Sequence, residues 1–86
     1  MKEMTTSGTV THMNRNRGMI AVEIDRRYTI IELLGDDVEL GDVLSWDESN
    51  PLGGDRVYSQ AQGRWLDVYF QNHEVPESQL RQQLLL

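Results

Sequence analysis

Two pairs of arginines are the side chains best suited by type and spacing to contact a ligand. Arg15 and Arg17 share one predicted turn, and Arg26 and Arg27 share the next. Guanidinium groups donate bidentate hydrogen bonds to phosphate oxygens, and turns project side chains outward. The pairs are predicted either to form a phosphate-contacting rim or to pair with acidic residues, of the same molecule or of a partner copy.

Rings on which unpaired bases stack are the second candidate feature. His12 lies on a predicted strand before the first arginine pair, and it either contacts a base or is a surface histidine without a ligand. Trp65 and Tyr69, with Arg64 beside them, form a second aromatic and basic face. This second face is predicted to stack on bases or to receive a C-terminal helix, and we favour the helix.

No motif for catalysis or metal binding accompanies these side chains. The chain contains no Gly-rich phosphate loop, nucleophile elbow or His-Glu-x-x-His, so we do not expect an enzyme. It has no cysteine, its two histidines are far apart, and the carboxylates of residues 36–42 lack the spacing of a calcium loop. We expect a solvated acidic loop there, and neither a metal nor a cofactor.

The charge of the chain is divided unevenly. The net charge is -6, yet residues 8–28 carry four arginines against two carboxylates, a balance of +2. Residues 29–55 carry eight carboxylates and no Lys or Arg, a balance of -8, and the remainder cancels. A polyanion is therefore expected to approach the first region and to avoid the second.

Length and composition indicate one domain. A chain of 86 residues buries only about 60% of its unfolded surface, which leaves no apolar mass for a second core. The polar start of the chain lacks the apolar run of a signal peptide, and no run is long enough for a membrane helix. We expect a cytoplasmic protein, monomeric or homodimeric, that does not bind a membrane.

Strand patterns occupy most of the chain. Short runs of β-branched and aromatic residues are punctuated by Gly, Asn and Asp, which predicts strands at 8–14, 17–24, 27–34, 42–47, 56–60 and 64–71. The stretch 48–55 contains Pro51 and Gly53-Gly54 and predicts a break. In the loop 35–41, Val38 and Leu40 are expected to pack down. The last two strands are expected to be a hairpin or one bent strand.

The end of the chain predicts a helix. Pro76 suits a first helical turn, and Leu80 and Leu84 are four residues apart on one face. We therefore expect an all-β fold, a five- or six-stranded closed barrel of OB type with a short C-terminal α-helix. Residues 1–7 are expected to be a flexible N-terminus, 8–72 the barrel, and 73–86 the helix, docked on the barrel or on a partner subunit.

The segment G-T-V-T-H-M-N-R-N-R-G-M-I-A-V resembles the first two strands of the cold-shock domain, an OB-type barrel with the pattern G-x-V-K-W-F-N-x-x-K-G-F-G-F-I. The positions that match at identical spacing are Gly8, Val10, Asn14, Arg17, Gly18 and Val22. The stretch VELGDVLSW resembles the entry of that family into its fourth strand. The resemblance covers about half of the chain and implies single-stranded nucleic-acid binding on these strands.

The positions that stack bases in that family are largely not aromatic here. They correspond to His12, Met13, Met19 and Ala21, and the family's third-strand motif falls near Tyr28. Each base–aromatic stack contributes about 1–3 kcal/mol, so the loss of three rings implies weak binding.

Two functions follow as hypotheses. The first is a module that binds single-stranded RNA or DNA weakly, through the residues His12, Arg15, Arg17, Met19, Arg27 and Tyr28, with Arg64, Trp65 and Tyr69 as a second face. The alternative is a protein-interaction or self-association module without nucleic-acid binding. It uses the acidic segment together with the C-terminal helix or the face of Trp65 and Tyr69.

Overall fold

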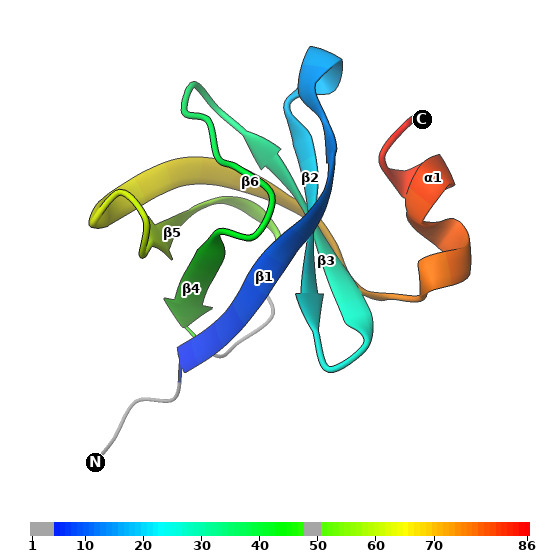
Figure 1. The fold of residues 1–86 in the computed structure, drawn as a ribbon, viewed down its shortest axis with the longest axis horizontal. Coiled ribbons are helices and arrows are strands. Elements are labelled where there is room, and N and C mark those ends of the chain that lie inside the picture. Colours follow the sequence, from blue (N-terminus) through cyan, green and yellow to red (C-terminus); the bar gives the residue numbers. More distant parts are fainter. Residues whose placement is uncertain (1–4, 48–50) are drawn as a thin grey trace.

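Six strands close into an antiparallel barrel, and a short helix follows the last strand (Figure 1). The computed structural model describes residues 5–47 and 51–86. The strands are β1 (Thr5–Asn14), β2 (Met19–Ile24), β3 (Arg27–Leu33), β4 (Val43–Asp47), β5 (Gly53–Ser59) and β6 (Arg64–Val75). Their order around the barrel is β1-β2-β3-β6-β5-β4, and β4 pairs with β1 to complete the circle. The all-β closed barrel is confirmed, with one strand more than the five of an OB-fold.

The first three strands form an antiparallel meander. A 3-10 turn, η1 (Arg15–Arg17), connects β1 to β2 and ends at Gly18, whose φ of 64° is left-handed. The turn between β2 and β3 consists of Asp25 and Arg26, both at positive φ, the geometry that matches the twist of a tight hairpin. Both connections lie where the sequence predicts turns, but the first continues through Gly18, so the predicted start of the second strand at residue 17 is wrong by two residues.

The long strand β6 joins the two halves of the barrel. Its first half pairs with β5, from Ser59↔Arg64 to Gly53↔Phe70, and its second half pairs with β3 as far as Tyr28↔Val75. Residues 56–60 and 64–71 are therefore a hairpin and not one bent strand. Two boundaries of this hairpin differ from prediction by more than one residue: β5 begins at Gly53, inside the expected break, and β6 continues to Val75. In both places backbone pairing with β6 or β3 outweighs the weak strand propensity of the residues.

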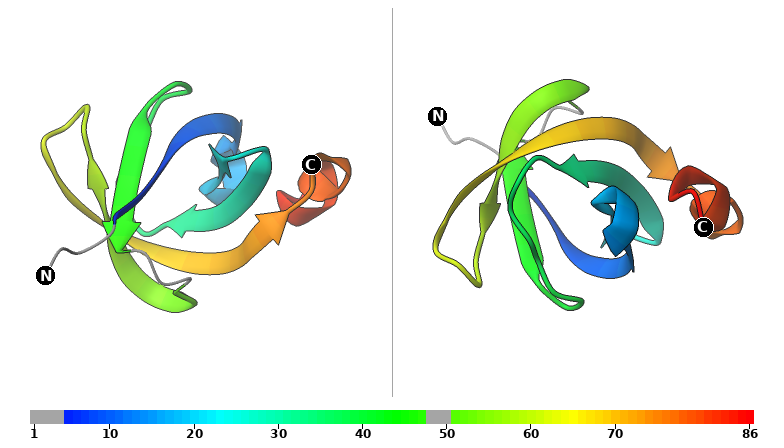
Figure 2. Two further views of the ribbon diagram at one scale, coloured as in Figure 1. Left: turned by 90° about the horizontal axis from the view of Figure 1, so that it is seen from below. Right: turned by 90° about the horizontal axis from the view of Figure 1, so that it is seen from above.

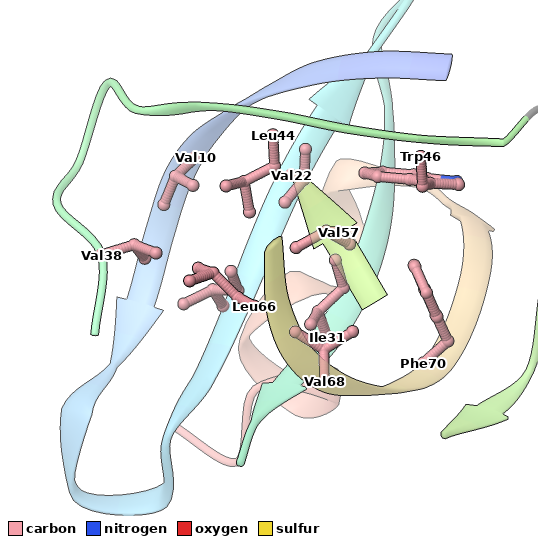
Figure 3. Packing of buried hydrophobic residues seen from close by; sticks show 11 residues of the cluster. Val10, Val22, Ile31, Val38, Leu44, Trp46, Val57, Leu66, Val68 and Phe70 are labelled. Atoms are coloured by element: carbon pink, nitrogen blue, oxygen red, sulfur yellow. The ribbon is translucent and has the colours of Figure 1, made fainter. Parts of the chain in front are cut away.

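The barrel interior is filled by side chains that alternate along each strand (Figure 3). Leu66, Val68 and Phe70 of β6 point inward and are at most 1% exposed. Trp46 is buried beside Phe70, with 5.3 Å between ring centroids, on the same side of β4 as the buried Leu44. In the loop after β3, Val38 is buried but Leu40 is 62% exposed, so the prediction that both pack down is wrong for Leu40.

Strand β1 pairs with two different strands and so closes the barrel. Residues 9–14 pair with β2, whereas residues 5–9 pair with β4. The predicted flexible N-terminus of residues 1–7 is therefore wrong for residues 5–7, because β4 supplies them with a hydrogen-bonding partner. The rest of that prediction, residues 1–4, lies outside the described residues.

The C-terminal helix packs on the outside of β2 and β3. It consists of a 3-10 turn, η2 (Glu77–Gln79), and α1 (Leu80–Gln83), so it starts after the predicted boundary at residue 73. Leu80 and Leu84 are buried in a second apolar cluster whose other members are Met19, Ala21, Tyr28, Ile30 and Val75. Figures 1 and 2 show this helix at the end of β6, on the side of the barrel away from β4 and β5. The helix therefore docks within its own chain.

Candidate functional site

The four arginines do not form one rim. Arg15 and Arg17 lie in η1 at one end of β2, and Arg26 and Arg27 lie at the other end. Six residues of strand separate the two pairs, roughly 15–20 Å at ~3.3 Å per residue. A shared phosphate-contacting surface is thus not assembled, because a strand connects the two turns.

Arg15 is paired with the acidic loop of the same molecule. Its guanidinium lies 3.0 Å from an oxygen of Asp37 and 3.5 Å from one of Glu39. In the same region Arg64 lies 2.6 Å from Asp36. Of the alternatives that the sequence leaves open, pairing within the molecule is the one observed for Arg15. These partly exposed pairs contribute little energy individually, but they hold the loop across the barrel end.

The strand surface that carries the resemblance to cold-shock domains is covered by the helix. Met19 is 7% exposed and Tyr28 is 8% exposed, both under Leu80 and Leu84. A base has no access to either side chain in this structure. His12 lies beside them, half-buried, with its ring edge-on to Tyr28 at 5.8 Å and its Nδ1 2.8 Å from the Thr11 hydroxyl.

Burial also changes the chemistry of Tyr28. It raises the pKa of the phenol above its ordinary value near 10, and the carboxylates of Glu23 and Glu77 act in the same direction. The neutral phenol is therefore favoured more in the folded chain than in the unfolded chain. The resulting stabilisation is complete below pH 10 and is lost as the pH rises through the folded pKa.

We therefore expect Tyr28→Phe to reduce the loss of stability in strong alkali. Urea unfolding at pH 8 and again near pH 11 measures this difference, and the other tyrosines cancel between the two proteins. An equal decrease in both proteins would show that Tyr28 ionises as freely in the folded chain as in the unfolded one.

The outward side of β5 and β6 carries a group of exposed aromatic and apolar side chains. Trp65 is 47% exposed and Tyr69 is 44% exposed, on the outward side of β6. Leu34, 53% exposed, follows β3, and its backbone N–H donates to the carbonyl of Asp67, midway between the two rings. The predicted docking of the C-terminal helix on Trp65 and Tyr69 is wrong, because the chain leaves β6 beside β3, at the far end from Trp65.

Neighbouring strands complete this surface. Tyr58 is opposite Trp65, and the two rings meet edge to face at 5.5 Å. The guanidinium carbon of Arg56 lies 5.1 Å from the centre of the Trp65 ring. The surface, here called the aromatic face, consists of Leu34, Arg56, Tyr58, Trp65, Asp67 and Tyr69.

The membership of the aromatic face differs from the sequence prediction. Arg64 was expected beside Trp65 on this face, but in the alternation of β6 it lies on the opposite side of the strand, where its exposed side chain pairs with Asp36. The cation on Trp65 is Arg56, from the neighbouring strand. Alternation along the strand predicts that Arg56 and Tyr58 lie on one face of β5. Whether that face adjoins Trp65 depends on the register of the hairpin between β5 and β6, which the sequence does not specify.

Further features of the described residues bear on function. In residues 5–47 and 51–86, no group of three or more His, Asp or Glu is placed to hold a metal ion. Within the same ranges, no helix has the length and apolar character needed to cross a membrane.

His73 is half-buried near the end of β6, where the Thr29 hydroxyl and the Pro51 carbonyl contact its ring nitrogens. Through Pro51 it links the segment before β5 to the barrel.

No protein-family model, curated protein or solved structure matches this chain.

Proposed function

We propose that this protein is a protein-interaction module and that the aromatic face is its contact surface. The observation that carries the proposal is the exposure of three large apolar side chains, Trp65 and Tyr69 on β6 and Leu34 just after the neighbouring strand β3. Exposed apolar side chains gathered on one surface are typical of interaction sites, whereas isolated ones are common everywhere.

The composition of the face supports a protein partner. Trp, Tyr and Arg are the residues that most often dominate the energy of protein interfaces, and the face contains all three types. Arg56 and Tyr58 contact Trp65 and restrict its side chain, so less conformational entropy is lost when a partner binds.

Electrostatics favour this proposal over nucleic-acid binding. The aromatic face has one arginine, Arg56, which is opposite Asp67. Arg15 and Arg64 are engaged by carboxylates, and the whole chain carries a net charge of -6. Nucleic-acid affinity depends mainly on cations that face phosphates, and the aromatic face offers one arginine for this purpose. Weak binding of single-stranded RNA or DNA is therefore the less favoured, competing proposal.

Site-specific photo-crosslinking tests the proposal. With p-benzoylphenylalanine at position 58, in cells of the organism that encodes the protein, we expect one discrete protein adduct. Trp65→Ala and Tyr69→Ala should each reduce its yield about tenfold or more, since buried interface aromatics contribute ~2 kcal/mol or more. Leu86→Ala, an exposed leucine elsewhere, is the matched control and should leave the adduct unchanged.

Two results would contradict the proposal. One is an adduct whose yield is the same in all three variants, or no greater than that from the probe at exposed position 82. The other is micromolar binding of mixed-sequence single-stranded RNA that weakens steeply with salt and is abolished by Trp65→Ala. This second result would assign the same face to nucleic acid.

A further inference from the structure

The two outward aromatic rings of β6 differ in their surroundings. Trp65 is contacted by Arg56 and Tyr58, whereas among the described residues no ring or cation is stacked on Tyr69. The strand neighbours of Tyr69 are Gly54 on one side and Glu32 on the other. Glycine has no side chain to cover the ring, so the ring of Tyr69 is open on the side of β5.

Two carboxylates lie next to this open ring. Asp67 is two residues before Tyr69, on the same face of β6, and Glu32 is directly opposite on β3. Asp67 has no ion pair with any residue that the structure describes, although Arg56 is its strand partner, because the Arg56 guanidinium lies over Trp65. Glu32 accepts a hydrogen bond from Gln71 and lines the same hollow as Arg17.

The acidic loop does not offer comparable carboxylates. Asp36 and Asp37 are paired with Arg64 and Arg15, and Asp42 accepts the backbone N–H of Glu39. Asp36 and Asp37 thus hold the loop on the barrel, and Asp42 closes a turn within the loop. Asp67 is therefore the carboxylate on the aromatic face best placed to meet an external cation.

We infer that the aromatic face recognises a basic side chain, Arg or Lys, of its protein partner, at a subsite formed by Tyr69 and Asp67. The inference rests on the proposed function and names the chemistry of the partner. A cation over an exposed tyrosine ring is attracted by the π-electrons, and a carboxylate two residues away on the same strand face adds an ion pair. Arg56 over Trp65 shows the same contact within the molecule. The acidic net charge favours approach of a basic partner.

The test uses defined peptides and the full chain. The probe is a labelled ten-residue peptide of alternating threonine and arginine, and the matched peptides carry glutamine or glutamate in place of arginine. Binding is followed by anisotropy and by the amide resonances of the protein. We expect the arginine peptide alone to bind and to shift the resonances of Gly54, Asp67 and Tyr69.

Matched variants separate the two contributions. Tyr69→Leu should weaken binding about three- to fivefold, and Tyr69→Phe should preserve it because the ring remains. Asp67→Asn should weaken binding about threefold. Asp25→Asn removes the same charge in the β2–β3 turn, where asparagine tolerates the φ of 50°, and should have little effect.

The inference is overturned if the glutamine peptide binds as tightly as the arginine peptide. It is also overturned if Asp67→Asn and Asp25→Asn weaken binding equally, or if the shifted resonances lie outside the aromatic face. In each case a crosslinked adduct that depends on Trp65 and Tyr69 leaves the proposed function standing. Loss of that adduct dependence removes the proposed function, whatever the peptides do.

Discussion

Leu84→Ala is expected to lower the free energy of unfolding by about 2–4 kcal/mol, the usual cost of removing a buried leucine. Leu84 is fully buried against β2 and β3, and its backbone N–H donates to Leu80 at 2.9 Å. Alanine is a good helix former, so the loss reports packing and not helix propensity. Urea or thermal unfolding measures it.

The matched control is Leu86→Ala, which removes the same atoms from a side chain that is 54% exposed, and its effect should stay within about 0.5 kcal/mol. Asn14 contributes to the same docking, because its side-chain amide donates to the carbonyl of Leu84 at 2.8 Å. Equal stability of the two leucine variants would mean that the helix does not pack on the barrel in solution.

Gly8→Ala is expected to lower the free energy of unfolding by at least about 2 kcal/mol, because a methyl group there overpacks the barrel. A Cβ at Gly8 would lie 2.6 Å from the backbone oxygen of Glu23 and 2.6 Å from Cγ1 of Val22. Backbone at such a distance has to move. The contact arises where β1 turns from β2 toward β4, so the shift also disturbs the closure of the barrel.

Gly54→Ala is the control for this substitution. Gly54 also lies in a strand, but a Cβ added there meets no atom within 4 Å. Alanine at this position is therefore expected to leave the free energy of unfolding nearly unchanged. Denaturant unfolding of both variants provides the comparison. A Gly8→Ala protein as stable as the Gly54→Ala protein would show that β1 and β2 are further apart in solution than in this structure.

The fold was largely predictable because its signals are local. Alternation of apolar and polar residues along residues 64–71 predicts both the inward side chains and the outward pair Trp65 and Tyr69. Glycine, proline and asparagine mark most of the connections. The errors fall at strand ends, such as residues 5–7 and 53–55, where a partner strand distant in sequence supplies the hydrogen bonds.

The candidate site was predictable only in part. Trp65 and Tyr69 follow from alternation within one strand, but Arg56 and Tyr58 depend on the register across the hairpin. The position of Leu34 on the aromatic face depends on the pairing of a third strand, β3, with β6. Met19 and Tyr28 were assigned to an open nucleic-acid surface, and the helix that buries them joins the barrel at a place that its own pattern does not specify.

The amino-acid pattern is sufficient to predict an all-β barrel with a short terminal helix, an acidic loop and an outward aromatic pair, because side-chain periodicity and turn chemistry act over a few residues. The pattern does not predict which face the helix covers, which carboxylates Arg15 and Arg64 contact, or which cation lies on Trp65. Those outcomes depend on contacts between strands far apart in the chain, where closure of the barrel sets the register and the exit direction of β6.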